Sequence, residues 1–224
     1  MEQLSVSKIH KEDFQPERVA FFSDAVFAIA ITLLIIDIKV PEQTGKVTDA
    51  WLWNYLGSIL TKLIGFFVSF FVIGLYWLSH HRLFRYVNKF HPKLLWANLL
   101  FLLPIILMPF STAFFSEYAI PGLRVPIMIY TINIVFTGLM SFRLWKIVSS
   151  PKYNMSIIVN NKPVRNYNLV RALAVPLAFV CVYIFSFFSG WMGYLVLYSL
   201  PLMTLGIRNY FRKKYPREME GQTG

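Results

Sequence analysis

Cysteine and charged side chains are scarce in this chain of 224 residues. It has a single cysteine, Cys181, which excludes an internal disulfide framework and a zinc site built on cysteine ligands. Charged residues make up only 15% of the sequence, whereas hydrophobic residues make up 56%. Soluble domains carry roughly 25% charged residues, so this shortage indicates an integral membrane protein.

Sequence motifs of catalysis and of export are also missing. His80 and His81 form the only histidine pair, and no HExxH pattern or acidic pair at ligand spacing accompanies them. A GxSxG element and a glycine-rich phosphate loop are absent as well. We therefore expect neither an enzyme nor a resident cofactor or metal. Residues 1–17 are polar with mixed charge, unlike the basic and then apolar order of a cleaved signal peptide.

Six long apolar runs are the main feature that is present. They predict an all-α integral membrane protein with six transmembrane helices in one domain covering residues 1–224. The runs are about 19–38, 56–79, 94–115, 125–142, 169–188 and 191–207, between a polar segment 1–17 and a basic tail 208–224. Ser189 and Gly190 alone join the last two runs, which predicts a tight helical hairpin. Trp51, Trp53 and Tyr55 open the second run as an interfacial belt.

The basic residues are unevenly divided among the connections. Of the 22 lysines and arginines, eighteen fall in the N-terminal segment, near the connections after runs two and four, or in the tail. The alternate connections hold only Lys39, Lys46 and Arg124. The positive-inside rule therefore places both termini in the cytoplasm. The net charge of +11 is spread over four segments facing lipid headgroups, so a nucleic-acid partner is not expected.

The first run carries a stripe of residues at helical spacing. Its members, separated by three or four positions, are Ile29, Thr32, Leu33 and Ile36. The sequence alone leaves two interpretations open, since the stripe could pack against the second and third runs or could line a pore. Lys62, inside the second run, is expected to snorkel outward, and Asp37 is expected to be a solvated charge at the helix end.

Three groups of residues give the chain a family resemblance. They are an R-x-x-x-F-S-D pattern (Arg18, Phe22, Ser23, Asp24), a Trp-x-x-His-His ending to run two (Trp77, His80, His81), and Asn98 with Pro109, Phe110 and Thr112 in run three. The chain resembles the transmembrane protein 175 family of potassium channels in its prokaryotic single-repeat form. That family lacks a T-V-G-Y-G filter, and none occurs here.

The resemblance implies a homotetramer in a lipid bilayer, with the first helix of each subunit lining a potassium-permeable pore. Ile29, Thr32, Leu33 and Ile36 match the positions to which constriction and selectivity are attributed in the family. Apolar rings would form the gate, and a threonine ring would aid selectivity. The single-repeat form further implies a bacterial plasma membrane.

The motif residues are expected to hold the first helix in place. We predict that Arg18, Ser23 and Asp24 form a hydrogen-bonded staple, with partners among Trp77, His80, His81 and Asn98, because an unpaired carboxylate there would be costly. A proton or cation site at Asp24 is the functional alternative. For the whole protein the alternative is a secondary transporter or a proton- or cation-coupled carrier, which would usually show an internal repeat that we do not detect.

Overall fold

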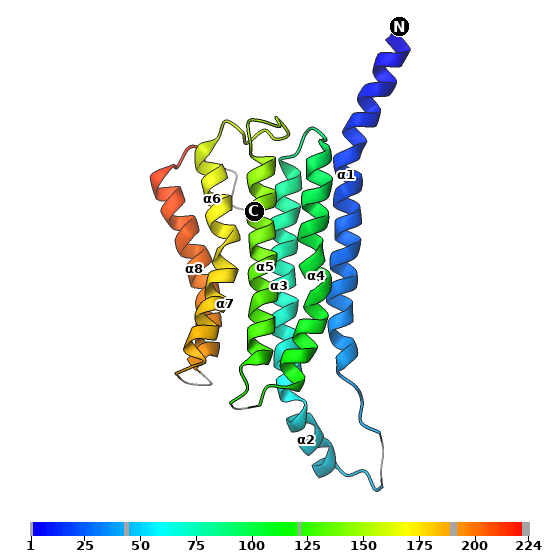
Figure 1. Ribbon diagram of the computed structural model, residues 1–224, viewed down its shortest axis with the longest axis vertical. Helices are drawn as coiled ribbons and strands as arrows, with labels where there is room; N and C mark the ends of the chain where they lie inside the picture. Colours follow the sequence, from blue (N-terminus) through cyan, green and yellow to red (C-terminus); the bar gives the residue numbers. More distant parts are fainter. Residues whose placement is uncertain (1, 43–44, 121, 189–191, 221–224) are drawn as a thin grey trace.

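The fold is that of an all-helical bundle in the computed structural model (Figure 1). Its backbone is described for residues 2–42, 45–120, 122–188 and 192–220, and its side chains for 16–42, 45–120, 122–188 and 200–220. The elements are α1 (Glu2–Leu33), a 3₁₀ turn η1 (Leu34–Asp37), α2 (Asp49–Ser58), α3 (Leu60–Arg85), α4 (Pro92–Glu117), α5 (Val125–Val148), α6 (Lys162–Ala172), α7 (Ala174–Phe185) and α8 (Met192–Lys214). In these ranges the only β-pairing is one isolated bridge between Val87 and Ser156.

Five segments within the described residues are long and apolar enough to cross a bilayer. They are Pro16–Asp37, Leu60–Arg85, Pro92–Glu117, Val125–Val148 and Lys162–Phe185, each of 22 to 26 residues. At 1.5 Å per residue such helices span a hydrocarbon core of roughly 30 Å. Helix α8, which covers most of the predicted sixth run, is not among the five, so the sixth span stays a prediction. Ser189 and Gly190 lie outside the described residues.

Helices α3, α4 and α5 form the central group of the bundle (Figure 1). Helix α1 lies against α3 and α4 on one side, and α7 packs on α5 and α8 on the other. The fully buried side chains at the centre include Ile73, Phe101, Ile105, Met108 and Ile134. Gly138 allows the close approach of α5 to α7, since a Cβ there would overlap the ring of Pro176.

Several predicted boundaries are wrong by a turn or more. The second span runs from Leu60 to Arg85. The residues before it form a separate short helix, α2, which begins at the N-cap Thr48, whose side chain accepts a hydrogen bond from the Trp51 amide. The predicted aromatic belt therefore lies on α2, where Trp51 and Tyr55 stack and Trp53 is exposed. The fourth helix continues to Val148, and the fifth starts at Lys162 with Asn161 as its cap.

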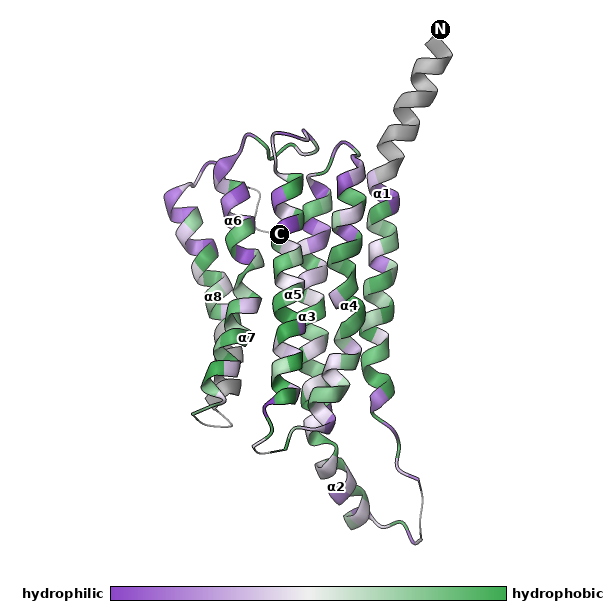
Figure 2. Ribbon diagram, in the orientation of Figure 1, coloured by the Kyte–Doolittle hydropathy of each residue, from purple (hydrophilic) through white to green (hydrophobic). Residues whose placement is uncertain are grey.

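The two ends of the bundle differ in charge. One end carries the α3–α4 and α5–α6 connections and the last turn of α8, and we call it the basic end; hydrophilic residues concentrate there (Figure 2). Basic residues occupy the last turns of the helices that finish there, including Arg82, Arg85, Lys146, Lys213 and Lys214. The connection from η1 to α3 and the α4–α5 connection lie at the other end, which we call the opposite end.

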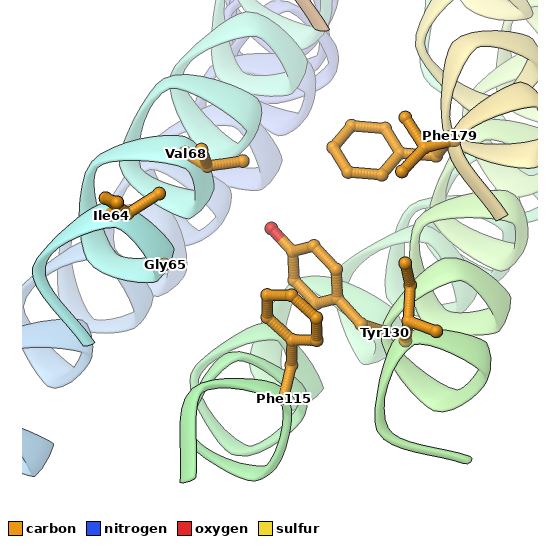
Figure 3. Close-up of a pocket in the computed structure, with 8 residues that line it drawn as sticks. Ile64, Gly65, Val68, Phe115, Tyr130 and Phe179 are labelled. Carbon is orange, nitrogen blue, oxygen red and sulfur yellow. The ribbon is translucent and has the colours of Figure 1, made fainter. Parts of the chain in front are cut away.

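A small cavity near the opposite end has no features of a ligand site. It measures about 20 Å³, and Gly65 of α3, Phe115 of α4, Tyr130 of α5 and Phe179 of α7 contribute to its lining (Figure 3). The Tyr130 hydroxyl is already hydrogen-bonded to Ser69 Oγ at 2.7 Å, so it is not a free polar group for a ligand in the cavity. A void of this size holds one water at most, and its wall is apolar.

Candidate functional site

Helix α1 has two distinct faces. The buried positions of α1 and η1 include one helical face that packs into the bundle: Val19, Ser23, Phe27, Ala30 and Leu34. The predicted stripe lies on the other face, where Ile29 is 58% exposed, Leu33 42% and Ile36 65%, and Thr32 is exposed as well. The interpretation that this stripe packs against the second and third spans of its own chain is therefore wrong. Among the described side chains of one chain, the stripe is an unpartnered apolar surface.

The change from α-helix to 3₁₀ turn after Leu33 preserves this surface. A 3₁₀ turn has three residues per turn, so residues three apart eclipse one another. Ile36 therefore lies over Leu33 along the axis, although the helix type changes between them. The stripe extends along α1 and η1 to the opposite end of the bundle.

Thr32 is the one hydroxyl in this stripe. Its Oγ1 donates to the backbone oxygen of Ile29 at 2.9 Å, a local bond that fixes the side-chain rotamer. A hydroxyl has two lone pairs in addition to its proton, so the oxygen of Thr32 can still accept a hydrogen bond or coordinate a cation.

A buried chain of hydrogen bonds joins α1 to α3 and α4 near the basic end. Asn98 Nδ2 donates to Ser23 Oγ at 2.8 Å, and Ser23 Oγ donates to the Val19 carbonyl at 2.8 Å. His80 Nε2 and Asn98 Oδ1 are 2.8 Å apart, and because the carboxamide oxygen can only accept, the histidine nitrogen carries the proton. Ser23 and Asn98 are fully buried and His80 is 3% exposed.

Aromatic rings enclose the histidine of this chain. The His80 ring stacks on Phe101 with centroids 5.5 Å apart and lies 4.6 Å from Phe84 and 5.7 Å from Phe27. Rings on three helices thus surround a single polar bond to Asn98. A buried donor in such surroundings is costly when its acceptor is lost.

The other motif residues are arranged differently. Asp24 Oδ1 accepts a hydrogen bond of 2.9 Å from Trp77 Nε1, and Asp24 is only half-buried. The His81 ring lies 5.8 Å from the Trp77 ring. Phe22 is 54% exposed, and Arg18 is exposed without a hydrogen bond or ion pair in the part of the chain that the structure describes. The predicted staple thus forms through Ser23 and Asp24, whereas Arg18 takes no part in it among the described side chains.

Sequence reasoning missed an ion-pair cluster at the opposite end. Lys62 Nζ lies 2.6 Å from Glu117 Oε2 of α4 and 3.8 Å from Asp37 Oδ2 of η1. The expectation that Asp37 is a simple solvated end charge is therefore wrong, whereas the Lys62 ammonium does reach the ends of the spans and pairs with carboxylates there. Lys62 lies only three residues into α3, so it meets the acidic ends of two neighbouring spans at one level.

We expect Lys62→Gln to lower the free energy of unfolding by less than about 1 kcal/mol, because ion pairs that keep contact with solvent contribute little. The loss should shrink further at high salt, which screens exposed charges. Thermal unfolding in detergent at two salt concentrations measures both effects, with Lys46→Gln as a control for the lost charge. A loss several times larger would mean that the cluster is a principal tie between α3 and its neighbours.

The helices described so far define a class: a polytopic α-helical membrane protein whose first helix presents an unpartnered stripe. Residues 18–109 match the family model described as endosomal/lysosomal potassium channel TMEM175. A potassium channel of Streptomyces collinus is 46% identical over 101 residues, which are 45% of this chain and 48% of that protein. One of Chamaesiphon minutus is 37% identical over 136 residues, 60% of this chain and 66% of that protein.

A solved structure extends the likeness over nearly the whole fold. The crystal structure of a lysosomal potassium-selective channel TMEM175 homolog from Chamaesiphon minutus matches with a TM-score of 0.69 and 28% identity. The match covers 88% of this chain and 98% of that chain. In sequence over residues 18–109, and in fold over most of its length, the chain is similar to the TMEM175 family. The sequence match to the Streptomyces protein spans about half of that protein's length.

Proposed function

We propose that this protein is a potassium-permeable channel that conducts passively through a pore lined by α1 of several subunits. The observation that carries the proposal is the stripe of Ile29, Thr32, Leu33 and Ile36, which stays exposed among the side chains that the structure describes. The stripe lies in the segment that the family model matches, and relatives from Streptomyces and Chamaesiphon are named potassium channels.

The chemistry of the stripe suits a gate and a weak selectivity site. Copies of α1 around an axis would form rings of Ile29, Leu33 and Ile36, and narrow apolar rings can close a pore by excluding water. A ring of Thr32 oxygens would replace part of the hydration shell of a potassium ion. Ile29 is nearest the basic end of the four, so its ring is our choice for the narrowest point.

The arrangement requires oligomerisation, because one chain contributes one such helix. Closed cyclic symmetry brings identical faces around a common axis, and a tetramer gives rings of four side chains. Together with the basic end facing the cytoplasm of a bacterial plasma membrane, this is the assembly that we propose. The eighteen basic residues on one side of the membrane support that orientation.

We expect the detergent-solubilised protein to have about four times the chain mass of 26.1 kDa. Light scattering combined with size-exclusion chromatography separates protein mass from bound detergent. A monomer that still conducts after reconstitution would refute a pore made by several copies of α1.

The function is tested by reconstitution into liposomes with a potassium gradient. A channel gives current that reverses near the potassium equilibrium potential and does not saturate in the way of a carrier. Vertebrate relatives such as that of Gallus gallus are named proton channels. A pH-sensitive dye inside the same liposomes therefore measures whether protons cross as well. Slow, saturable flux with fixed coupling between two ions would favour the secondary transporter instead.

A further inference from the structure

A surface groove at the basic end has no part in the proposed pore. It lies between α4, α5 and the connection that follows α5, and it measures about 530 Å³. Lys93, Arg143 and Lys146 contribute to its lining, and none of the described residues that line it is acidic. We call this feature the basic groove.

The positive charge of the basic groove is not compensated by any carboxylate among the described side chains. Arg143 and Lys146 are exposed and, like Lys93, form no ion pair with any carboxylate that the structure describes. Lys93 Nζ donates to the Tyr153 hydroxyl at 2.9 Å and lies 4.9 Å from the ring centroid. That hydrogen bond lowers the pKa of the Tyr153 phenol, and the charges of Lys93 and Lys152 act in the same direction. The groove is therefore electropositive and offers several donors to an anion.

An apolar surface continues from the basic groove along α4. Trp96 and Leu100 belong to the groove itself and are 69% and 37% exposed. The same face continues toward the opposite end through Leu103, Leu107 and Phe110, which are 47%, 44% and 63% exposed. A tryptophan at the basic end of an exposed apolar helix face is typical of the boundary between headgroups and acyl chains.

We propose that the basic groove binds the phosphate headgroup of an anionic phospholipid, with an acyl chain lying along the exposed face of α4. Basic pockets between transmembrane helices bind anionic headgroups, whereas surrounding neutral lipids offer no net charge to match. A free phosphate would bind to the same cations, yet it would leave the exposed apolar face of α4 next to them without a role. The proposal concerns lipid binding and is independent of ion conduction.

Native mass spectrometry of the purified full-length protein tests this inference by titration with phosphatidylglycerol and with phosphatidylcholine. We expect Lys93→Gln/Arg143→Gln/Lys146→Gln to weaken phosphatidylglycerol binding about tenfold or more and to leave phosphatidylcholine binding unchanged, given the contribution of each basic residue near a lipid surface. The matched control is Arg85→Gln/Lys89→Gln/Arg212→Gln, which removes three exposed charges outside the groove. It should keep the preference of the unmodified protein. Arg143→Gln and Lys146→Gln alone serve if the triple variant does not fold, and each should weaken phosphatidylglycerol binding severalfold.

Three results would overturn the inference. One is an equal loss in the groove variants and in the control, which would mean a general charge effect. Another is displacement of phosphatidylglycerol by equimolar inorganic phosphate, which would indicate a free-anion site. The third is a change of oligomeric mass in the groove variants with the lipid preference retained, which would make the groove a contact between subunits.

Discussion

Asn98→Leu is expected to lower the stability of the bundle by about 1–3 kcal/mol, because it leaves the His80 Nε2 proton without an acceptor. The histidine ring is enclosed by Phe27, Phe84 and Phe101, so no solvent can replace the lost oxygen. Ser23 loses the bond that it accepts but keeps its own donation to the Val19 carbonyl. The midpoint of thermal unfolding in detergent measures the loss.

A second substitution separates a hydrogen-bond effect from a packing effect. His80→Phe combined with Asn98→Leu removes donor and acceptor together, and such paired replacements are nearly neutral when the shape is kept. The double variant should therefore be more stable than Asn98→Leu alone, and Asn88→Ala on the exposed α3–α4 connection is the control. If Asn98→Leu unfolds at the unmodified midpoint, Asn98 does not hold α1 in place. Asp24→Asn should have a smaller effect than Asn98→Leu, since an amide oxygen still accepts from Trp77.

Thr32→Val is expected to reduce the preference for potassium over sodium about fivefold, while the tetramer stays intact. Valine keeps the shape of threonine and removes only the oxygen, and a lost contact on the order of 1 kcal/mol corresponds to that ratio. Ile29→Ala acts differently, because a smaller side chain widens an apolar ring and lowers the barrier to water entry. It should raise conductance or open probability and retain much of the selectivity.

Reversal potentials under bi-ionic conditions measure the selectivity of each variant. Thr61→Val is the matched control, because it removes an exposed hydroxyl from α3 rather than from α1. A control position on α1 itself, such as Ala30, is unsuitable, since Ala30 is 1% exposed and a larger side chain there would disturb packing. An unchanged reversal potential for Thr32→Val, with a shift for Thr61→Val, would place the ion path elsewhere.

Local patterns made the stripe and most of the staple predictable from sequence. The spacing of Ile29, Thr32, Leu33 and Ile36 is a property of one helix, and buried polar side chains such as Ser23 and Asn98 need partners wherever they lie. The sequence could not decide whether the stripe was covered by its own chain, because that depends on how α1 is rotated against α3 and α4.

Features that depend on the vertical alignment of different helices were not predictable. The cluster of Lys62, Asp37 and Glu117 forms because the start of α3 meets the ends of η1 and α4 at one level. Hydropathy locates each span only to within a few residues, which is about one helical turn of uncertainty at each end. For the same reason, the separate helix α2 was merged with the second span.

The central claim is that the stripe on α1 faces a water-filled pore rather than lipid, and thiol accessibility tests it most directly. Cys181 is the only cysteine, so Cys181→Ser gives a background without thiols. Leu33→Cys places a thiol on the stripe, and Phe110→Cys places one on the exposed face of α4. Asp37 and Glu117 mark the level of Lys62 in the bundle, because both pair with it. Counted along their own helices, Leu33 and Phe110 both lie about 8–10 Å from that level.

A charged, membrane-impermeant thiol reagent added to reconstituted channels distinguishes the two environments, because thiolates form in water and not in lipid. We predict that the reagent modifies Leu33→Cys and blocks its potassium current, while Phe110→Cys is unmodified and keeps its current. Modification of Phe110→Cys with Leu33→Cys left untouched would contradict the pore that we assign to α1.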